Sequence, residues 1–101
     1  MPPMDMPLSS HQCRILCAIF EEPTRADIDW DDFVSLVKAL GGKWLKPGKT
    51  GGSRRRAKLR DKKGLFHAPH PGSIMKKGSV ESAREFLLKA GATPAKEGCT
   101  C

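Results

Sequence analysis

The chain has 101 residues, 39% hydrophobic and 29% charged, which is the composition of one globular domain with a modest core. Aromatic residues make up only 6%, which argues against a broad platform for stacking bases. No apolar run approaches the roughly 18 residues of a membrane span, and no basic stretch followed by an apolar one opens the chain. We therefore expect no membrane contact and no secretory signal, and we expect a cytoplasmic location.

The net charge of +7 is distributed unevenly along the chain. Of the 18 Lys and Arg residues, only Arg14 and Arg25 precede Phe33, whereas seven of the 11 acidic residues do. A basic surface attracts polyanions, and nucleic acid is the commonest of these. A solvated basic face that only maintains solubility would have the same composition.

A helix is predicted near the start of the domain. Residues 1–8 show no periodicity and are expected to form a flexible leader ahead of a single domain over residues 9–92. Ser9 and Gln12 fit a capping box, and apolar residues at helical spacing follow them. Pro23 then ends the helix.

A second helix is predicted over Trp30–Leu40, with Asp29 as its N-cap and Gly41 and Gly42 at its end. Carboxylates in a first helical turn are favoured by the helix dipole. The acidic residues here either cap and solubilise the helix or contact the basic face of a neighbouring subunit. They are Asp27, Asp29, Asp31 and Asp32.

Three short strands are predicted next. Residues 43–46 suit an edge strand, residues 47–52 form a loop, and residues 53–61 alternate with a period of two. Residues 61–64 suit a hairpin turn, and residues 65–68 form the partner strand. The even positions of the middle strand are all basic: Arg54, Arg56, Lys58 and Arg60.

The last predicted element is a helix over residues 80–90, capped by Ser79, after a basic loop over residues 72–78. The order of elements is helix, helix, three strands, helix. This order predicts an α+β fold in which helices pack on one face of an antiparallel three-stranded sheet.

The four cysteines fall into two pairs, Cys13 with Cys17 and Cys99 with Cys101. Their spacings are unusual for a zinc site, so a dimer stapled by zinc is a weak alternative. We interpret the first pair as small apolar residues of a helix and the second as part of a disordered tail over residues 93–101. The lack of a secretory signal argues against disulfides, and no metal or cofactor is expected.

The loop that leads into the middle strand is a candidate phosphate site. Gly52 lets the backbone approach a phosphate closely, and Ser53 and Arg54 can donate to its oxygens. An ordinary hairpin loop has the same composition. Side chains two residues apart on a strand point the same way, about 7 Å apart, close to the spacing of phosphates along a nucleic acid. The predicted RNA contacts are Gly52, Ser53, Arg56, Lys58, Arg60, Lys76 and Lys77.

Two histidines, His67 and His70, lie within four residues of each other beside prolines. A single histidine in a strand is more often structural, but two beside a basic loop suit acid–base catalysis near neutral pH. RNA supplies its own nucleophile, the 2′-hydroxyl, so cleavage needs a base, an acid and cations for the developing phosphorane charge. The candidate catalytic residues are His70, His67 and Arg54.

Three stretches together resemble the HicA family of toxin–antitoxin ribonucleases. They are Gly51-Gly52-Ser53-Arg54, Phe66-His67-x-Pro69-His70-Pro71 and Lys77-Gly78-x-Val80-x-x-x-Arg84-Glu85-Phe86-Leu87-x-x-Ala90-Gly91. The resemblance runs from about Gln12 to Ala92. It implies a fold like a double-stranded-RNA-binding domain, α-β-β-β-α, with an extra N-terminal helix. It also implies metal-independent mRNA cleavage by the toxin of a type II toxin–antitoxin module, with a HicB-like antitoxin as partner.

The chain departs from this family at Arg54, where much of the family has a catalytic histidine. Arginine stays protonated near neutrality and cannot act as a general base. Two hypotheses follow. Either His70, with His67 as helper, transfers the proton while Arg54 binds phosphate, or the protein binds RNA or an antitoxin without cutting RNA.

Overall fold

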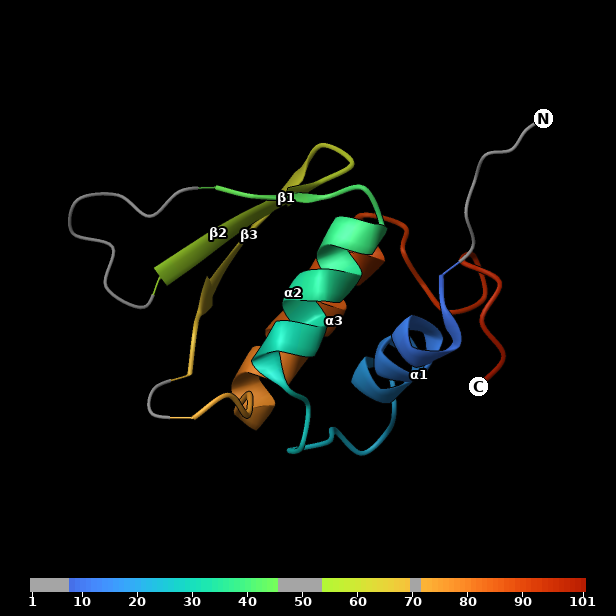
Figure 1. Cartoon of the computed structure of the whole chain (residues 1–101), viewed down its shortest axis with the longest axis horizontal. Coiled ribbons are helices and arrows are strands. Elements are labelled where there is room, and N and C mark those ends of the chain that lie inside the picture. Colours follow the sequence, from blue (N-terminus) through green and yellow to red (C-terminus); the bar gives the residue numbers. More distant parts are fainter. Residues whose placement is uncertain (1–7, 46–53, 70–71) are drawn as a thin grey trace.

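The computed structural model describes residues 8–45, 54–69 and 72–101. Three helices and three strands occur in this part of the chain, and the strands form one antiparallel sheet in the order β1-β2-β3 (Figure 1). The predicted α+β class and order of elements are confirmed. The elements are α1 (Ser10–Ile19), α2 (Trp30–Ala39), β1 (Lys43–Trp44), β2 (Arg54–Leu59), β3 (Lys62–His67) and α3 (Lys77–Lys89).

The first two helices begin at the caps that the sequence predicts. The Ser9 hydroxyl accepts from the backbone N–H of Gln12 at 3.1 Å, and the Gln12 side chain accepts from the Ser9 N–H at 3.0 Å. At α2, the Asp29 carboxylate accepts from the N–H groups of Asp31 and Asp32. These bonds satisfy amide groups that a helix N-terminus leaves without a partner.

The core lies between the sheet and the pair α2 and α3, which cover its inner face, while α1 packs on α2 and α3 beyond the sheet (Figure 1). Five aromatic rings connect these layers with centroids 5.1 to 6.4 Å apart, in tilted or edge-to-face contacts that suit ring quadrupoles. The rings belong to Trp30, Phe33, Trp44, Phe66 and Phe86. In residues 8–45, 54–69 and 72–101, no helix lies over the opposite face of the sheet.

The β2–β3 hairpin turns earlier than the sequence predicts. Its turn residues are Arg60 and Asp61, both with positive φ (49° and 69°), as in the two-residue turns that match strand twist. Pairing therefore starts at Leu59 and Lys62. A turn over residues 61–64 would have placed His67 opposite Lys58. The observed turn places it opposite Arg54.

Helix α3 also begins earlier than predicted. Lys76 is its N-cap, makes no side-chain capping bond, and leaves Ser79 inside the first turn. The preceding segment is fixed instead by backbone pairing with the start of α2, because Trp30 N–H donates to Ser73 and Met75 N–H donates to Ile28. Tertiary pairing thus sets this helix start where a local cap was expected.

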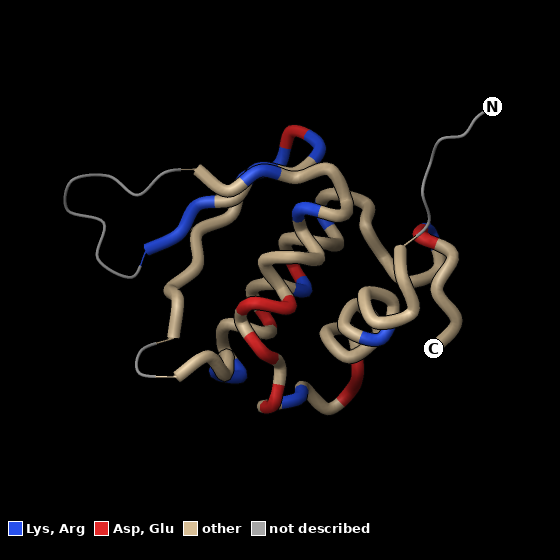
Figure 2. Tube along the Cα trace, in the orientation of Figure 1, with Lys and Arg blue, Asp and Glu red and all other residues tan. Residues whose placement is uncertain are grey.

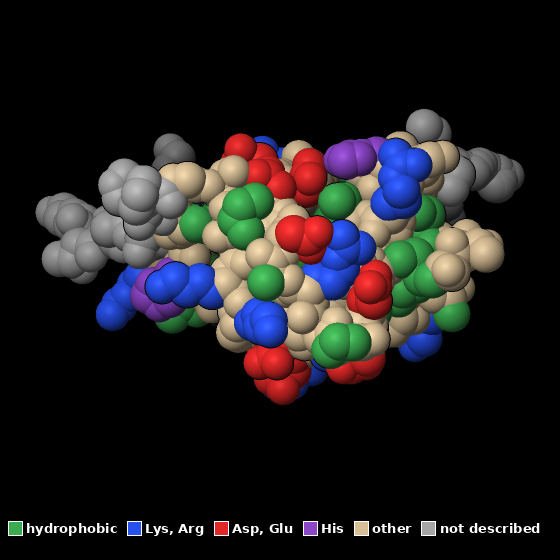
Figure 3. Space-filling model, turned by 90° about the horizontal axis from the view of Figure 1, so that it is seen from below, with side chains coloured by type: hydrophobic (Ala, Val, Ile, Leu, Met, Phe, Trp, Pro, Cys, Tyr) green, Lys and Arg blue, Asp and Glu red, His purple; other side chains and the backbone are tan. Residues whose placement is uncertain are grey.

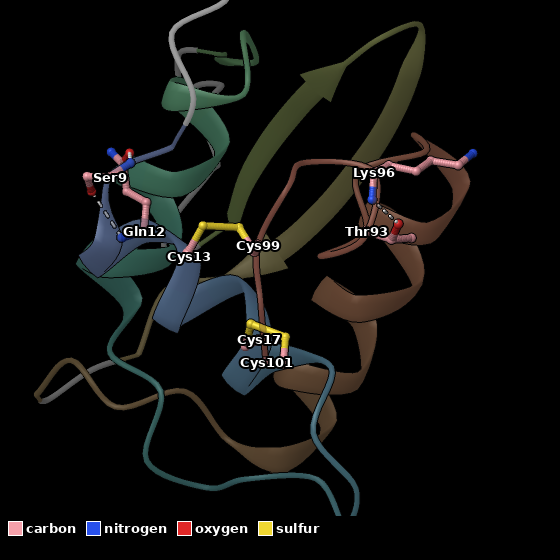
Figure 4. Close-up of a disulfide and its surroundings, with 8 residues drawn as sticks. All are labelled: Ser9, Gln12, Cys13, Cys17, Thr93, Lys96, Cys99 and Cys101. Atoms are coloured by element: carbon pink, nitrogen blue, oxygen red, sulfur yellow. Dashed lines mark hydrogen bonds between the residues drawn. A yellow bond between two sulfur atoms is a disulfide. The ribbon is translucent and has the colours of Figure 1, made fainter.

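The predicted disordered tail is instead attached to α1 by two disulfides, Cys13–Cys99 and Cys17–Cys101 (Figure 4). This corrects both the interpretation of the tail and the argument against disulfides. The two cysteines of α1 are one turn apart on a single helix face, about 6 Å along its axis. Residues separated by two in extended chain are about 6.6 Å apart, so the two spacings match.

The side chain of Arg84 connects α3 to the end of α1. Its guanidinium donates to the carbonyls of Ile19 and Glu21 at 2.9 and 3.0 Å, and it also contacts Glu22 and Thr24. It is only 16% exposed. These bonds satisfy carbonyl groups that a helix C-terminus leaves without intrahelical partners.

We expect Arg84→Met to lower the free energy of unfolding by about 2–3 kcal/mol, because it leaves carbonyl groups at the end of α1 without their charged donor. Urea unfolding followed by circular dichroism measures this change. Lys89→Met is the matched control, because Lys89 makes only an exposed ion pair with Glu85. Equal stability of the two variants would contradict a structural role for Arg84.

Candidate nucleic-acid interface

The outward positions of the three strands form rows across the sheet. One row consists of three lysines, because Lys43 pairs with Lys58 and Lys58 pairs with Lys63. All three side chains are exposed. Like charges directly opposite each other destabilise a sheet, so this row costs stability unless a polyanion covers it.

A second row, at the far end of the hairpin, pairs Arg54 with His67. Both residues are exposed, and directly opposite residues have Cβ atoms about 5 Å apart. Two of the three predicted catalytic residues are therefore neighbours on one open face. His70 lies outside the described residues, as do Gly52 and Ser53.

The middle row places Arg56 between two leucines. Arg56 pairs with Leu65, and the N–H of Leu45 donates to the Arg56 carbonyl at 2.8 Å. We call the three rows together the cationic face. It consists of Lys43, Leu45, Arg54, Arg56, Lys58, Lys63, Leu65 and His67, and it includes no acidic residue.

Several cations elsewhere in the described chain have acidic partners. Arg60 contacts Glu97 at 3.1 Å, Arg84 contacts Glu22 at 2.8 Å and His11 contacts Asp32 at 3.2 Å. No such ion pair occurs on the cationic face within the described residues. The positive charge of the cationic face is therefore available to a ligand, whereas Arg84 and Lys89 of α3 are paired with glutamates.

Arg60 does not belong to the cationic face, contrary to the prediction. It lies in the hairpin turn, where its guanidinium contacts Glu97 and the carbonyl of Ala90. The strand alternation ends at Leu59, so the sequence period no longer sets the direction of this side chain. Lys76 and Lys77 are exposed at the start of α3, which follows β3 along the chain.

Most acidic residues lie away from the cationic face, although Asp61 lies in the hairpin turn at one end of it. Figure 2 shows acidic residues along the connector from α1 to α2 and at the start of α2, and also at the tip of the hairpin, while Lys and Arg follow β2. Figure 3 shows basic and histidine side chains together at the left-hand end, and acidic side chains across the middle. In this connector, the hydrogen bond from Arg25 lowers the pKa of the Asp27 carboxyl, and the same bond raises the pKa of Arg25.

Sequence reasoning missed four members of the cationic face: Lys43, Leu45, Lys63 and Leu65. The alternation of β2 alone could not identify them, because they lie on the two neighbouring strands. The register between β2 and β3, which places Lys63 and Leu65, depends on the turn at Arg60 and Asp61, whose positive φ values the sequence does not indicate.

The described residues contain no group of three or more His, Cys, Asp or Glu side chains that could hold a metal ion. All four cysteines are in disulfides, so a zinc-stapled dimer has no thiolates to supply its ligands. This corrects the zinc alternative. Among the described helices, none is long and apolar enough to cross a membrane.

Comparison with known proteins identifies no relative: no family model, no curated protein and no solved structure matches the chain.

Proposed function

We propose that the chain binds RNA through its cationic face and cleaves it beside His67. The observation that carries this proposal is the ladder of cations without acidic partners across three strands: Lys43, Arg54, Arg56, Lys58 and Lys63. A phosphate backbone is the polyanion whose repeat matches such a ladder, because successive outward positions on β2 are about 7 Å apart. Binding by such contacts releases counterions and weakens steeply with salt.

The row that pairs Arg54 with His67 supports cleavage as the finer part of this proposal. A guanidinium can hold the phosphate and stabilise the charge of the phosphorane, while an imidazole beside it accepts or donates a proton. The reaction is attack of the ribose 2′-hydroxyl on the adjacent phosphorus, with departure of the 5′-oxygen. His70 completes the acid–base pair in this proposal, and Lys76 and Lys77 extend the RNA contact beyond β3.

The resemblance to HicA extends the proposal to a biological role. The chain would be the toxin of a type II toxin–antitoxin module, located in the cytoplasm, with a fold of the double-stranded-RNA-binding type and a HicB-like antitoxin as its partner. The order α2-β1-β2-β3-α3 supports this fold type. Expression of the chain alone should arrest growth, and an adjacent gene for a HicB-like protein should relieve the arrest.

A second candidate function is an RNA-binding or antitoxin-binding module without catalysis. Arg54 favours it, because this position holds the catalytic histidine in much of the family that the chain resembles. Both candidates predict RNA binding by the cationic face, and they differ only in cleavage.

Charge reversal on the cationic face tests the shared part of both candidates. We expect Arg56→Glu/Lys58→Glu to weaken binding of a 12-nucleotide RNA at least 30-fold at 0.1 M salt. The slope of log K against log salt should also become shallower by about 1.4, since roughly 0.7 counterions leave per contact on a single strand. Fluorescence anisotropy measures both quantities.

The matched control is Lys38→Glu/Lys96→Glu, which changes the net charge equally but alters exposed lysines of α2 and the tail. We expect this control to change affinity by threefold or less. Equal losses in the two variants would show that only net charge matters and would remove the cationic face from the proposal.

A further inference from the structure

The middle of the cationic face is apolar, which phosphate binding alone does not explain. Leu45 and Leu65 are 44% and 48% exposed on either side of Arg56. A hollow of about 300 Å³ lies here, lined by Leu45, Arg56, Ala57, Lys63, Gly64 and Leu65. Its size is at the lower end of the range of small-ligand pockets.

Gly64 lets α3 pack closely against the core side of β3 at this part of the hairpin. A Cβ at this position would lie 2.8 Å from the rings of Phe66 and Phe86, so only glycine lets α3 pack this closely against β3. Gly64 faces Ala57 across the strands, and both positions are directed toward the core, so only their backbone lies between the two leucines on the cationic face. The floor of the hollow is therefore strand backbone, and Leu45 and Leu65 rise from it on either side.

Charge surrounds this hollow on both sides along the strands. The lysine row of Lys43, Lys58 and Lys63 lies on one side, and Arg54 with His67 lies on the other. An occupant that fits must have a flat or apolar body with negative charge on either side of it. A nucleotide within a single strand has this form, because its base lies between two phosphates. In a duplex the base is stacked and paired, and its faces are unavailable.

We propose that this hollow holds one unpaired base of a single-stranded RNA, which deepens the proposed function and rests on it. The base lies between Leu45 and Leu65, and the Arg56 guanidinium stacks on it, as arginine does on planar aromatic groups. The flanking phosphates contact the lysine row and Arg54. The protein thereby prefers single strands, and its preference comes from contact with a base.

The test compares wild type with Leu45→Ser/Leu65→Ser, in which only exposed side chains change. The probes are an eight-nucleotide oligouridylate and an eight-base-pair RNA duplex, measured by fluorescence anisotropy. We expect the variant to bind the single strand about tenfold more weakly, with an unchanged salt slope, and to bind the duplex as wild type does. The control is Ile74→Ser/Leu88→Ser, whose side chains are 51% and 52% exposed and belong to residues outside the three strands; it should bind both probes normally.

A third probe is an octamer that lacks the bases at its two central positions. Together with the leucine variant it forms a double-mutant cycle. Wild type should bind it about tenfold more weakly than the intact octamer, and the leucine variant should bind both equally, because the two changes remove the same contact. Equal wild-type affinity for the intact and baseless octamers would overturn the base site while leaving RNA binding in place, and would assign the leucines to a protein partner. Failure of wild type to bind either RNA would instead overturn the proposed function.

Discussion

Reduction of the two disulfides should lower the free energy of unfolding by about 5–7 kcal/mol, an amount close to the total stability of a small domain. Each bridge closes a loop of more than 80 residues, since the sequence separations are 86 and 84. In the chain-entropy model such a loop contributes about 4–5 kcal/mol. The second bridge then closes only the short ring formed by residues 13–17 and 99–101, so its added contribution is smaller.

The loop closed by Cys17–Cys101 overlaps almost entirely with the loop closed by Cys13–Cys99, so removal of one bridge should cost much less than removal of both. Cys13→Ala/Cys99→Ala should cost only about 2 kcal/mol, because Cys17–Cys101 still closes almost the same loop. Guanidinium unfolding, with and without a phosphine reductant, measures each value. The variant without any cysteine is the control, and it should match reduced wild type and show no response to the reductant. Identical curves for oxidised and reduced wild type would contradict the pairing.

The tail also contacts the domain outside the two bridges. Ala92 is fully buried, and Glu97 reaches across to Arg60 in the hairpin turn. The tail therefore connects α1 to the far end of the sheet. Disulfides are typical of oxidising compartments and rare in the cytosol of mesophiles. Alkylation of free thiols followed by mass spectrometry, on protein taken from its own cell, will show whether the four cysteines are oxidised or reduced there. The proposed cytoplasmic location must be consistent with that oxidation state.

The parts of the fold that the sequence predicts are those encoded by local chemistry. Ser9 with Gln12, and Asp29 with the two amides after it, satisfy helix N-termini by bonds within four residues. The period of β2 likewise follows from neighbouring residues, and Arg54, Arg56 and Lys58 point to one side as expected.

The parts that it does not predict depend on distant contacts. The turn at Arg60 needs positive φ at a residue that disfavours it, and Arg60 also contacts Glu97 and Ala90 from another part of the chain. The start of α3 depends on pairing with residues 28–30. The disulfides join segments more than 80 residues apart, and only the match between helical and extended spacing points to them. In the candidate site, Arg54 and His67 are neighbours because of the β2–β3 register, which the turn at Arg60 and Asp61 sets.

Replacement of both candidate histidines, His67→Ala/His70→Ala, should reduce RNA cleavage at least 100-fold while RNA affinity changes by threefold or less. A general acid or base contributes about 10²- to 10⁴-fold to rate, and neither substitution removes a cation of the ladder. His67→Ala alone should show a clear part of this loss, because His67 is the histidine that pairs with Arg54. The measurement is the single-turnover rate on a labelled RNA, with anisotropy for affinity. Wild type should leave 2′,3′-cyclic phosphate ends, and chelators should not slow it.

Two further variants separate catalysis from binding. His11→Ala is the matched control, because its ring contacts Asp32 and it lies on α1 rather than on the sheet; we expect wild-type cleavage. Arg54→Lys keeps the positive charge but loses the planar donor fork, so it should slow cleavage more than it weakens binding. Cleavage that persists in the double histidine variant would remove both imidazoles from the mechanism. Salt-sensitive binding by wild type, with no cleavage of any RNA tested, would instead establish the binding module, with Arg54 acting only as a phosphate contact.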